Sequence, residues 1–264
     1  MGSLAPQERS LADCVRRDGL FARLSWLAVF PIAAPRFESR VRGFVSMSSP
    51  LSIDVFWSFR SPYSYLAIRR LVALQADFNV QVNVRPVLPL AVRTPEFFQR
   101  VNPLFPGYLV RDVMRLGEFM DIPIRWPRPD PVVMNPDQTY PVEQPYIHRL
   151  TRLGIAAAQK NHGLSFLDEV SQVIWDGSVE SWHEGDHLAQ ATARAGLDLA
   201  ELDALIEHNP GSFIEAIEEN QKALETAGHW GVPTMVFEGE PFFGQDRIDL
   251  LIWRLKQAEP DIFE

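Results

Sequence analysis

The sequence contains a single cysteine, Cys14, among its 264 residues. One thiol cannot form a disulfide within the chain, and it supplies neither a C-x-x-C redox pair nor a cysteine-based zinc site. Disulfide exchange by a cysteine pair of the protein's own is therefore excluded. The scarcity of cysteine also favours a reducing compartment, and we expect a cytoplasmic protein.

Long apolar runs are also missing. The longest, residues 24–35, falls short of the roughly 18 residues that a membrane-spanning helix needs. Arginines precede this run, as in an export signal, but Asp18 and Pro31 argue against that interpretation. We expect residues 1–46 to be an extension without a folded role, either disordered or upstream of a translation start at Met47, and we expect no membrane partner.

Basic residues are fewer than acidic ones. The chain has 25 Lys and Arg against 34 Asp and Glu, which gives a formal net charge of -9. Binding to nucleic-acid phosphates needs clustered cations, so this balance argues against a nucleic-acid partner.

An apolar strand followed by a capped helix opens the part of the chain that we expect to fold. In residues 51–57, Ile53, Val55 and Trp57 share one face and Phe56 adds the other, as in a strand buried on both sides. A helix is predicted over residues 62–75, because a serine at the N-cap and a proline at the first helical position precede helically spaced apolar residues. A second strand is predicted over residues 80–86.

The middle of the chain has a different character. Apolar periodicity predicts helices over residues 147–161, 164–176, 187–195 and 213–227, whereas the prolines of residues 126–145 exclude a single helix there and predict an ordered loop.

The chain then returns to strand chemistry. A hairpin is predicted over residues 234–243 with its turn at 238–240, followed by a helix over 245–258. We therefore expect an α/β domain made of residues 51–88 and 230–264, interrupted by an all-helical insertion over residues 89–229.

Ser61 is a candidate catalytic residue. The N-terminus of a helix offers unpaired N–H groups and the positive end of the helix dipole, which stabilise an anion such as a thiolate. A simple capping role for Ser61 is the alternative from this motif alone.

Two further segments are candidate binding sites. The Val232-Pro233 bond precedes a strand; a cis bond there would present the Val232 backbone to a peptide, although a plain turn is the alternative. Gln245 and Asp246 open the last helix, where their side chains could hold the ends of a small peptide, or simply start the helix. His183 and His187 are spaced like metal ligands, but Gly185 lies between them, so we assign no metal site.

These segments together resemble a known family. Residues 56–67 (FWSFRSPYSYLA), Arg85-Pro86, residues 231–234 (GVPT) and residues 242–247 (FFGQDR) are similar to the 2-hydroxychromene-2-carboxylate isomerases and the kappa-class glutathione transferases, within the DsbA-like group. The resemblance covers about residues 51–260. It implies a thioredoxin-like domain with a helical insertion, glutathione as cofactor and, by analogy, a homodimer.

The resemblance also implies a role for each candidate residue. Ser61 would donate a hydrogen bond to the glutathione sulfur, Val232 before a cis Pro233 would pair its backbone with the cysteinyl unit, and Gln245 and Asp246 would hold the γ-glutamyl end. The thiolate would add to a conjugated carbon of a small aromatic-derived acid, whose double bond then rotates before glutathione is eliminated.

One segment departs from the family. After Pro86 the family usually carries a Gly-Gly stretch followed by an Asn and a Lys or Arg segment, whereas this chain has residues 87–95 (VLPLAVRTP), in which Arg93 is the candidate partner for the glycyl carboxylate.

From the resemblance as a whole we expect a glutathione-dependent isomerase. The alternatives are a kappa-like glutathione transferase or another thiol-dependent enzyme, and a non-catalytic thioredoxin-like protein that binds peptides.

Overall fold

A four-stranded sheet in the order β2-β1-β3-β4 organises the computed structural model, which describes residues 50–135 and 139–260. The predicted extension, residues 1–46, lies outside the described residues. β1 pairs in parallel with β2 and antiparallel with β3, and β3 pairs antiparallel with β4. The strands are β1 (Leu51–Trp57), β2 (Val80–Pro86), β3 (Thr234–Phe237) and β4 (Glu240–Phe243), as predicted from the sequence.

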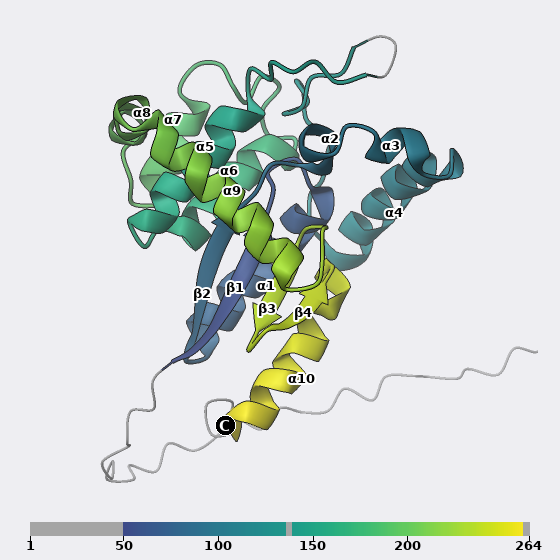
Figure 1. Cartoon of the computed structure of the whole chain (residues 1–264), viewed down its shortest axis with the longest axis vertical. Helices are drawn as coiled ribbons and strands as arrows, with labels where there is room; N and C mark the ends of the chain where they lie inside the picture. Colours follow the sequence, from purple (N-terminus) through teal and green to yellow (C-terminus); the bar gives the residue numbers. More distant parts are fainter. Residues whose placement is uncertain (1–49, 136–138, 261–264) are drawn as a thin grey trace, which may run out of the picture. The chain divides into compact units, whose positions relative to one another are not determined.

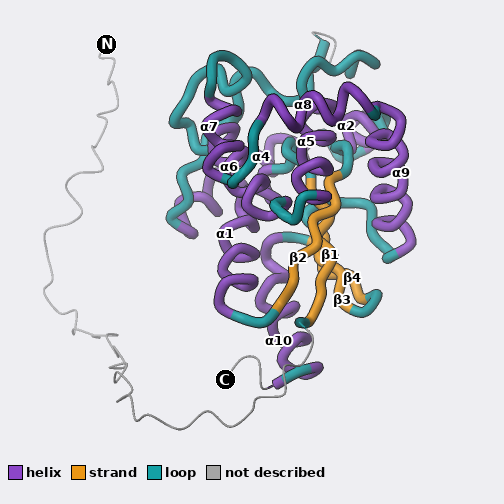
Figure 2. Tube along the Cα trace, turned by 90° about the vertical axis from the view of Figure 1, so that its left-hand side faces the viewer, coloured by secondary structure: helices purple, strands orange, loops and turns teal. Residues whose placement is uncertain are grey.

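The central strand β1 is buried on both faces. Ile53, Val55 and Trp57 are fully buried on one face, and Phe56 is 1% exposed on the other. Helices α1 (Pro62–Asp77) and α10 (Ile248–Ala258) pack on the first face, while α9 (Pro210–Thr226) packs on the second through a cluster that joins Leu224 to Phe56. Figure 2 shows the strands between α1 on one side and α9 on the other. The prediction that this strand is buried on both faces is confirmed.

Helix α1 is the crossover between the parallel strands β1 and β2, the connection that parallel pairing requires. Its buried face carries Leu66, Ile68 and Leu71, each at most 1% exposed. Burial of such a side chain contributes about 1.5–3 kcal/mol. These contacts fix the axis of α1 against the sheet and therefore fix where its N-terminus lies.

The chain between β2 and β3 is helical, as predicted (Figure 1). The four predicted helices are confirmed as α5 (Ile147–Gln159), α6 (Gly163–Trp175), α7 (His187–Arg194) and α9. Residues 121–146 contain no helix where they are described. The helices that were not singled out from the sequence are α2 (Leu90–Arg93), α3 (Phe97–Arg100), α4 (Leu104–Met120) and α8 (Leu199–His208).

The helical segment shares its core with the sheet. α5 packs against β2, and α6 packs against α1, so one hydrophobic cluster runs from Val55 in β1 through Phe166 in α6 to Leu202 in α8. The fold is thus a thioredoxin-like α/β sheet with a large helical insertion, and the insertion does not enclose a separate core.

The β3–β4 hairpin turns at Glu238 and Gly239, whose φ angles of 49° and 82° match a two-residue type I′ turn. The helix predicted over residues 245–258 begins as a 3-10 turn, η1 (Gln245–Arg247), and becomes α-helical at Ile248. No helix in the described ranges, 50–135 and 139–260, is long and apolar enough to cross a membrane.

Candidate active site at the N-terminus of α1

Ser61 caps helix α1. Its Oγ accepts a hydrogen bond from the Ser64 N–H at 3.2 Å, and Pro62 follows at the first helical position. No acidic residue lies in the first turn of α1. The positive end of the helix dipole is therefore not offset by a carboxylate within that turn, which suits the binding of an anion.

The turn that carries Ser61 is anchored by the helical insertion. The carbonyl oxygen of Phe59 accepts a hydrogen bond from the indole Nε1 of Trp175 in α6 at 2.9 Å. The Phe59 ring also packs edge to face against Phe166, with 6.2 Å between ring centroids. The insertion therefore helps to fix the position of the cap.

Val232 lies directly opposite Ser61. The Ser61 hydroxyl donates to the carbonyl oxygen of Val232 at 3.1 Å, although the two residues are 171 positions apart. The Val232–Pro233 bond is cis. From the sequence a cis bond was one alternative beside a plain turn, and the family resemblance implied it; the structure has the cis isomer.

The Val232 N–H has no acceptor within the described part of the chain. Several groups around it are paired: Trp230 O with Arg93, Gly231 N with His229, Gly231 O with Thr234, Val232 O with Ser61, and Pro233 O with Gly244 N. A half-buried unpaired donor beside the cap is suited to a ligand carbonyl.

Asp246 lies near the same helix end. Its exposed carboxylate contributes to the raised pKa of Tyr63, the second residue of α1, which burial and the hydrogen bond to Asp112 raise most. Gly244 permits this placement, because a Cβ on Gly244 would lie 2.5 Å from the Asp246 Oδ1, and its φ is 103°. Gln245 is buried, and its carbonyl oxygen accepts a hydrogen bond from Arg70 in α1 at 3.4 Å.

The Arg93 guanidinium is bound to the protein's own backbone. It donates to the carbonyl oxygens of Leu88 at 2.6 Å and Trp230 at 2.8 Å, and burial lowers its pKa. Arg93 thus ties the segment after β2 to the segment before Val232. The partner expected for the glycyl carboxylate is instead engaged in holding the protein's own backbone.

Sequence reasoning missed an aromatic series next to Val232. Phe97 packs against Trp230 with 5.1 Å between centroids, and His229 stacks on Phe243 at 4.0 Å. The Nδ1 of His229 accepts the Gly231 N–H at 2.9 Å, and burial lowers the pKa of His229. Trp230 and Phe243 keep nearly half of their surfaces exposed, which leaves apolar area for a ligand beside the unpaired N–H.

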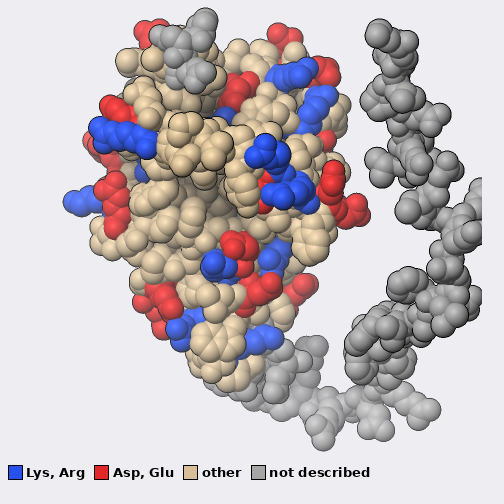
Figure 3. All heavy atoms as spheres, turned by 90° about the vertical axis from the view of Figure 1, so that its right-hand side faces the viewer, with Lys and Arg blue, Asp and Glu red and all other residues tan. Residues whose placement is uncertain are grey.

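The face of the molecule that carries α3, α4 and β4 is hollowed near its middle, and uncharged side chains predominate there (Figure 3). From α4, Asp112 accepts a hydrogen bond from the hydroxyl of Tyr63 at 2.9 Å. The long helix α4 is thereby connected to the first turn of α1.

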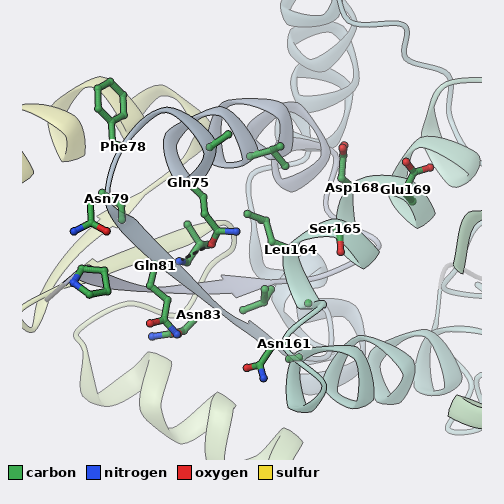
Figure 4. A pocket seen from close by; sticks show the side chains of 18 of the residues that line it. Gln75, Phe78, Asn79, Gln81, Asn83, Asn161, Leu164, Ser165, Asp168 and Glu169 are labelled. Carbon is green, nitrogen blue, oxygen red and sulfur yellow. Dashed lines mark hydrogen bonds between the residues drawn. The ribbon is translucent and has the colours of Figure 1, made fainter. Parts of the chain in front are cut away.

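A separate cavity of about 690 Å³ lies at the other end of α1, along β2 and the start of α6 (Figure 4). It is lined by Gln75 near the C-terminus of α1, roughly 20 Å from Ser61 at a rise of about 1.5 Å per residue. Its Asp168 has a pKa raised by burial. The cavity is therefore separate from the candidate site, which we place by its chemistry.

No group of three or more metal-ligating side chains is found in the described ranges. The ring of His183 packs against Tyr146 and Trp182, with centroid distances of 4.9 and 5.6 Å. His187 is the first residue of α7.

Comparison with known proteins agrees with the fold. The sequence pattern of the DSBA-like thioredoxin domain matches residues 52–256. Glutathione S-transferase kappa 1 of Rattus norvegicus is 22% identical over 217 residues, which cover 78% of this chain and 92% of that protein. The 2-hydroxychromene-2-carboxylate isomerase of Pseudomonas putida is 22% identical over 204 residues, covering 75% and 91%. A solved structure of a 2-hydroxychromene-2-carboxylate isomerase superposes with a TM-score of 0.60 at 20% identity, over 80% of this chain and 98% of that one.

Proposed function

Because the chain belongs to the DSBA-like thioredoxin family, we propose that it is a glutathione-dependent isomerase of the 2-hydroxychromene-2-carboxylate type, acting on a small conjugated, aromatic-derived acid. The observation that carries this proposal is the pairing of the Ser61 hydroxyl with Val232, whose own N–H is unpaired, at the N-terminus of α1. A family member without a cysteine at this position needs a thiol from outside, and the chain's only cysteine, Cys14, lies elsewhere in the sequence.

The polar groups at the site suit a glutathione molecule. The unpaired Val232 N–H would meet a carbonyl oxygen of the cysteinyl unit, and the exposed Asp246 carboxylate would meet the ammonium group of the γ-glutamyl end. Ser61 would turn its proton from the Val232 carbonyl oxygen towards the sulfur. When bound, glutathione supplies a thiolate that adds reversibly to a conjugated double bond and so permits rotation.

The protein's own contribution is to keep this thiol ionised and the substrate in place. A thiol has an ordinary pKa of about 8.5, and a helix N-terminus lowers it. The Ser61 hydroxyl adds a hydrogen bond to the charged form, worth about 1.5–3 kcal/mol. Trp230 and Phe97 offer apolar surface on which a flat, conjugated substrate can stack.

Two alternatives share the same residues. A glutathione transferase of the kappa type is favoured by the likeness to the Rattus norvegicus protein. A non-catalytic protein that binds peptides is favoured by the engagement of Arg93, because it removes the expected partner of the glycyl carboxylate.

The test is turnover of 2-hydroxychromene-2-carboxylate, followed by its absorbance spectrum with and without glutathione. The isomerase proposal predicts conversion that saturates with glutathione. Consumption of glutathione by an electrophilic aromatic halide, without isomerisation, would identify a transferase. Absence of both reactions would leave the peptide-binding protein and contradict the proposal.

A further inference from the structure

Arg60, the residue before the Ser61 cap, is held rigidly at one end of its guanidinium. Its Nε lies 2.6 Å from Asp130 Oδ1, and its side chain is 25% exposed. Asp130 is itself fixed, since its Oδ2 accepts the indole N–H of Trp126 at 3.1 Å and its Oδ1 accepts the Val132 N–H at 2.9 Å. The ion pair therefore orients Arg60 within a preformed loop.

One face of the guanidinium is also covered. The Arg60 Cζ lies 4.7 Å from the ring centroid of Trp126, and Trp126 packs edge to face against Trp175 with 5.5 Å between centroids. The ion pair engages the Nε of Arg60, and the cation–π contact covers one face of its guanidinium. The two Nη groups remain, and neither donates to an acceptor in residues 50–135 or 139–260. Two adjacent Nη groups in a fixed plane match the two oxygens of a carboxylate.

An aromatic series leads from Tyr140 to Trp230, which lies two residues before Val232. Burial raises the pKa of Tyr140, and the charge of Arg60 opposes that rise. The series runs from Tyr140 to Phe98, Phe97 and Trp230, with centroid distances of 6.4, 5.1 and 5.1 Å. Because Ser61 follows Arg60 and contacts Val232, this series borders the same helix end as the candidate site.

We propose that Arg60 binds the carboxylate of the substrate and makes the site selective for anionic aromatic acids over their neutral analogues. Asp130 is its positioning residue. This inference rests on the proposed function, because it names the group that recognises the acid while Ser61 and Val232 hold the thiol. The two arginines thus have different roles: Arg93 holds backbone carbonyl oxygens of the protein, whereas Arg60 holds none among the described residues and would bind the substrate.

The test uses chromone-2-carboxylate, a flat bicyclic acid that cannot isomerise, and its neutral carboxamide. Calorimetric titration into the full chain gives both dissociation constants. We expect the acid to bind at least tenfold more tightly than the amide, and we expect Arg60→Gln to bind the two equally. Arg60→Lys, which keeps the charge but loses the fork, should show an intermediate preference.

Arg194→Gln is the matched control. Arg194 pairs through its Nε with Glu169 at 2.5 Å beside the distant cavity, so its loss removes the same charge and the same kind of ion pair. This variant should keep the preference of the wild type. Circular dichroism of each variant checks that it is folded.

Equal binding of acid and amide by the wild type, or an undiminished preference in folded Arg60→Gln, would overturn the role of Arg60. Glutathione titrations of the same proteins keep the two proposals apart. If glutathione binds but the acid is not preferred, Arg60 has no such role. If the acid is preferred through Arg60 but glutathione does not bind, the proposed function is wrong and the acid site stands.

Discussion

Replacement of Ser61 by alanine separates its structural role from its chemical role. The variant loses the cap bond to the Ser64 N–H and the bond to the Val232 carbonyl oxygen. A lost cap costs about 1 kcal/mol, and a lost neutral hydrogen bond costs about 1 kcal/mol more. The expected loss of about 2 kcal/mol is small enough to leave a domain with a typical stability of about 5–15 kcal/mol folded.

Ser61→Ala should affect turnover more strongly than it affects stability. Loss of a hydrogen bond worth about 1.5–3 kcal/mol to the thiolate should raise the pKa of bound glutathione by about 1–2 pH units, and turnover near neutral pH should fall by roughly tenfold to 150-fold. Thiolate absorbance as a function of pH measures the first effect, and initial rates measure the second. Urea unfolding measures the stability of the same samples.

Asp198→Ala provides the control for capping alone. Asp198 caps α8 by accepting the Glu201 N–H at 2.9 Å, so this variant should lose about 1 kcal/mol and keep its turnover. If Ser61→Ala keeps wild-type turnover and an unchanged pKa of bound glutathione, Ser61 is a helix cap only, and the catalytic argument fails.

Three further predictions concern the stability of the fold. Arg93→Met should lower the free energy of unfolding by about 2–4 kcal/mol, because two hydrogen bonds from a charged group are lost; a change below about 1 kcal/mol in urea unfolding would show that Arg93 does not hold the segment before Val232. Tyr63→Phe should lower the free energy of unfolding by about 1–2 kcal/mol, because Asp112 loses a half-buried hydrogen-bond donor. An unchanged midpoint in urea unfolding would contradict the contact between α4 and α1. Asp168→Asn should stabilise the protein near neutral pH. Burial raises the pKa of Asp168 above its ordinary value of 3.8, so the folded state loses stability as the pH rises and this carboxyl ionises. Thermal melts should show a higher melting temperature for the variant near neutral pH, and this difference should disappear at a pH low enough to protonate Asp168.

The parts of the fold that follow from local chemistry could be predicted from the sequence. Ser61-Pro62 fixes the start of α1, the alternation of Ile53, Val55 and Trp57 predicts a buried strand, and Glu238-Gly239 predicts the hairpin turn. Each of these signals depends on residues within a few positions of one another. Their agreement with the structure explains why the fold class was predicted correctly.

Helix α4 was missed because its apolar residues are not confined to its buried face. It fully buries only Val113 and Gly117, and it exposes Leu104 and Phe119. Its polar contact, from Asp112 to Tyr63, links residues 49 positions apart.

Long-range pairing also limited the prediction of the site. Arg93 was identified as a candidate ligand for glutathione, but it bonds to Trp230, which lies 137 positions away. The ion pair between Arg60 and Asp130 and the packing of Phe97 on Trp230 likewise depend on tertiary structure. By contrast, proline makes the cis isomer accessible, so a cis bond before Pro233 was one of two alternatives from the sequence, and the family resemblance implied it.

Calorimetric titration of glutathione into the full chain and into Asp246→Ala tests the central claim most directly. Asp249→Ala is the matched control, because Asp249 is an exposed carboxylate three residues further on that pairs with Arg70. The account predicts saturable binding by the wild type and by Asp249→Ala, and at least tenfold weaker binding by Asp246→Ala. No binding to the wild type at millimolar glutathione, or equal affinity in all three proteins, would contradict a glutathione site at the N-terminus of α1.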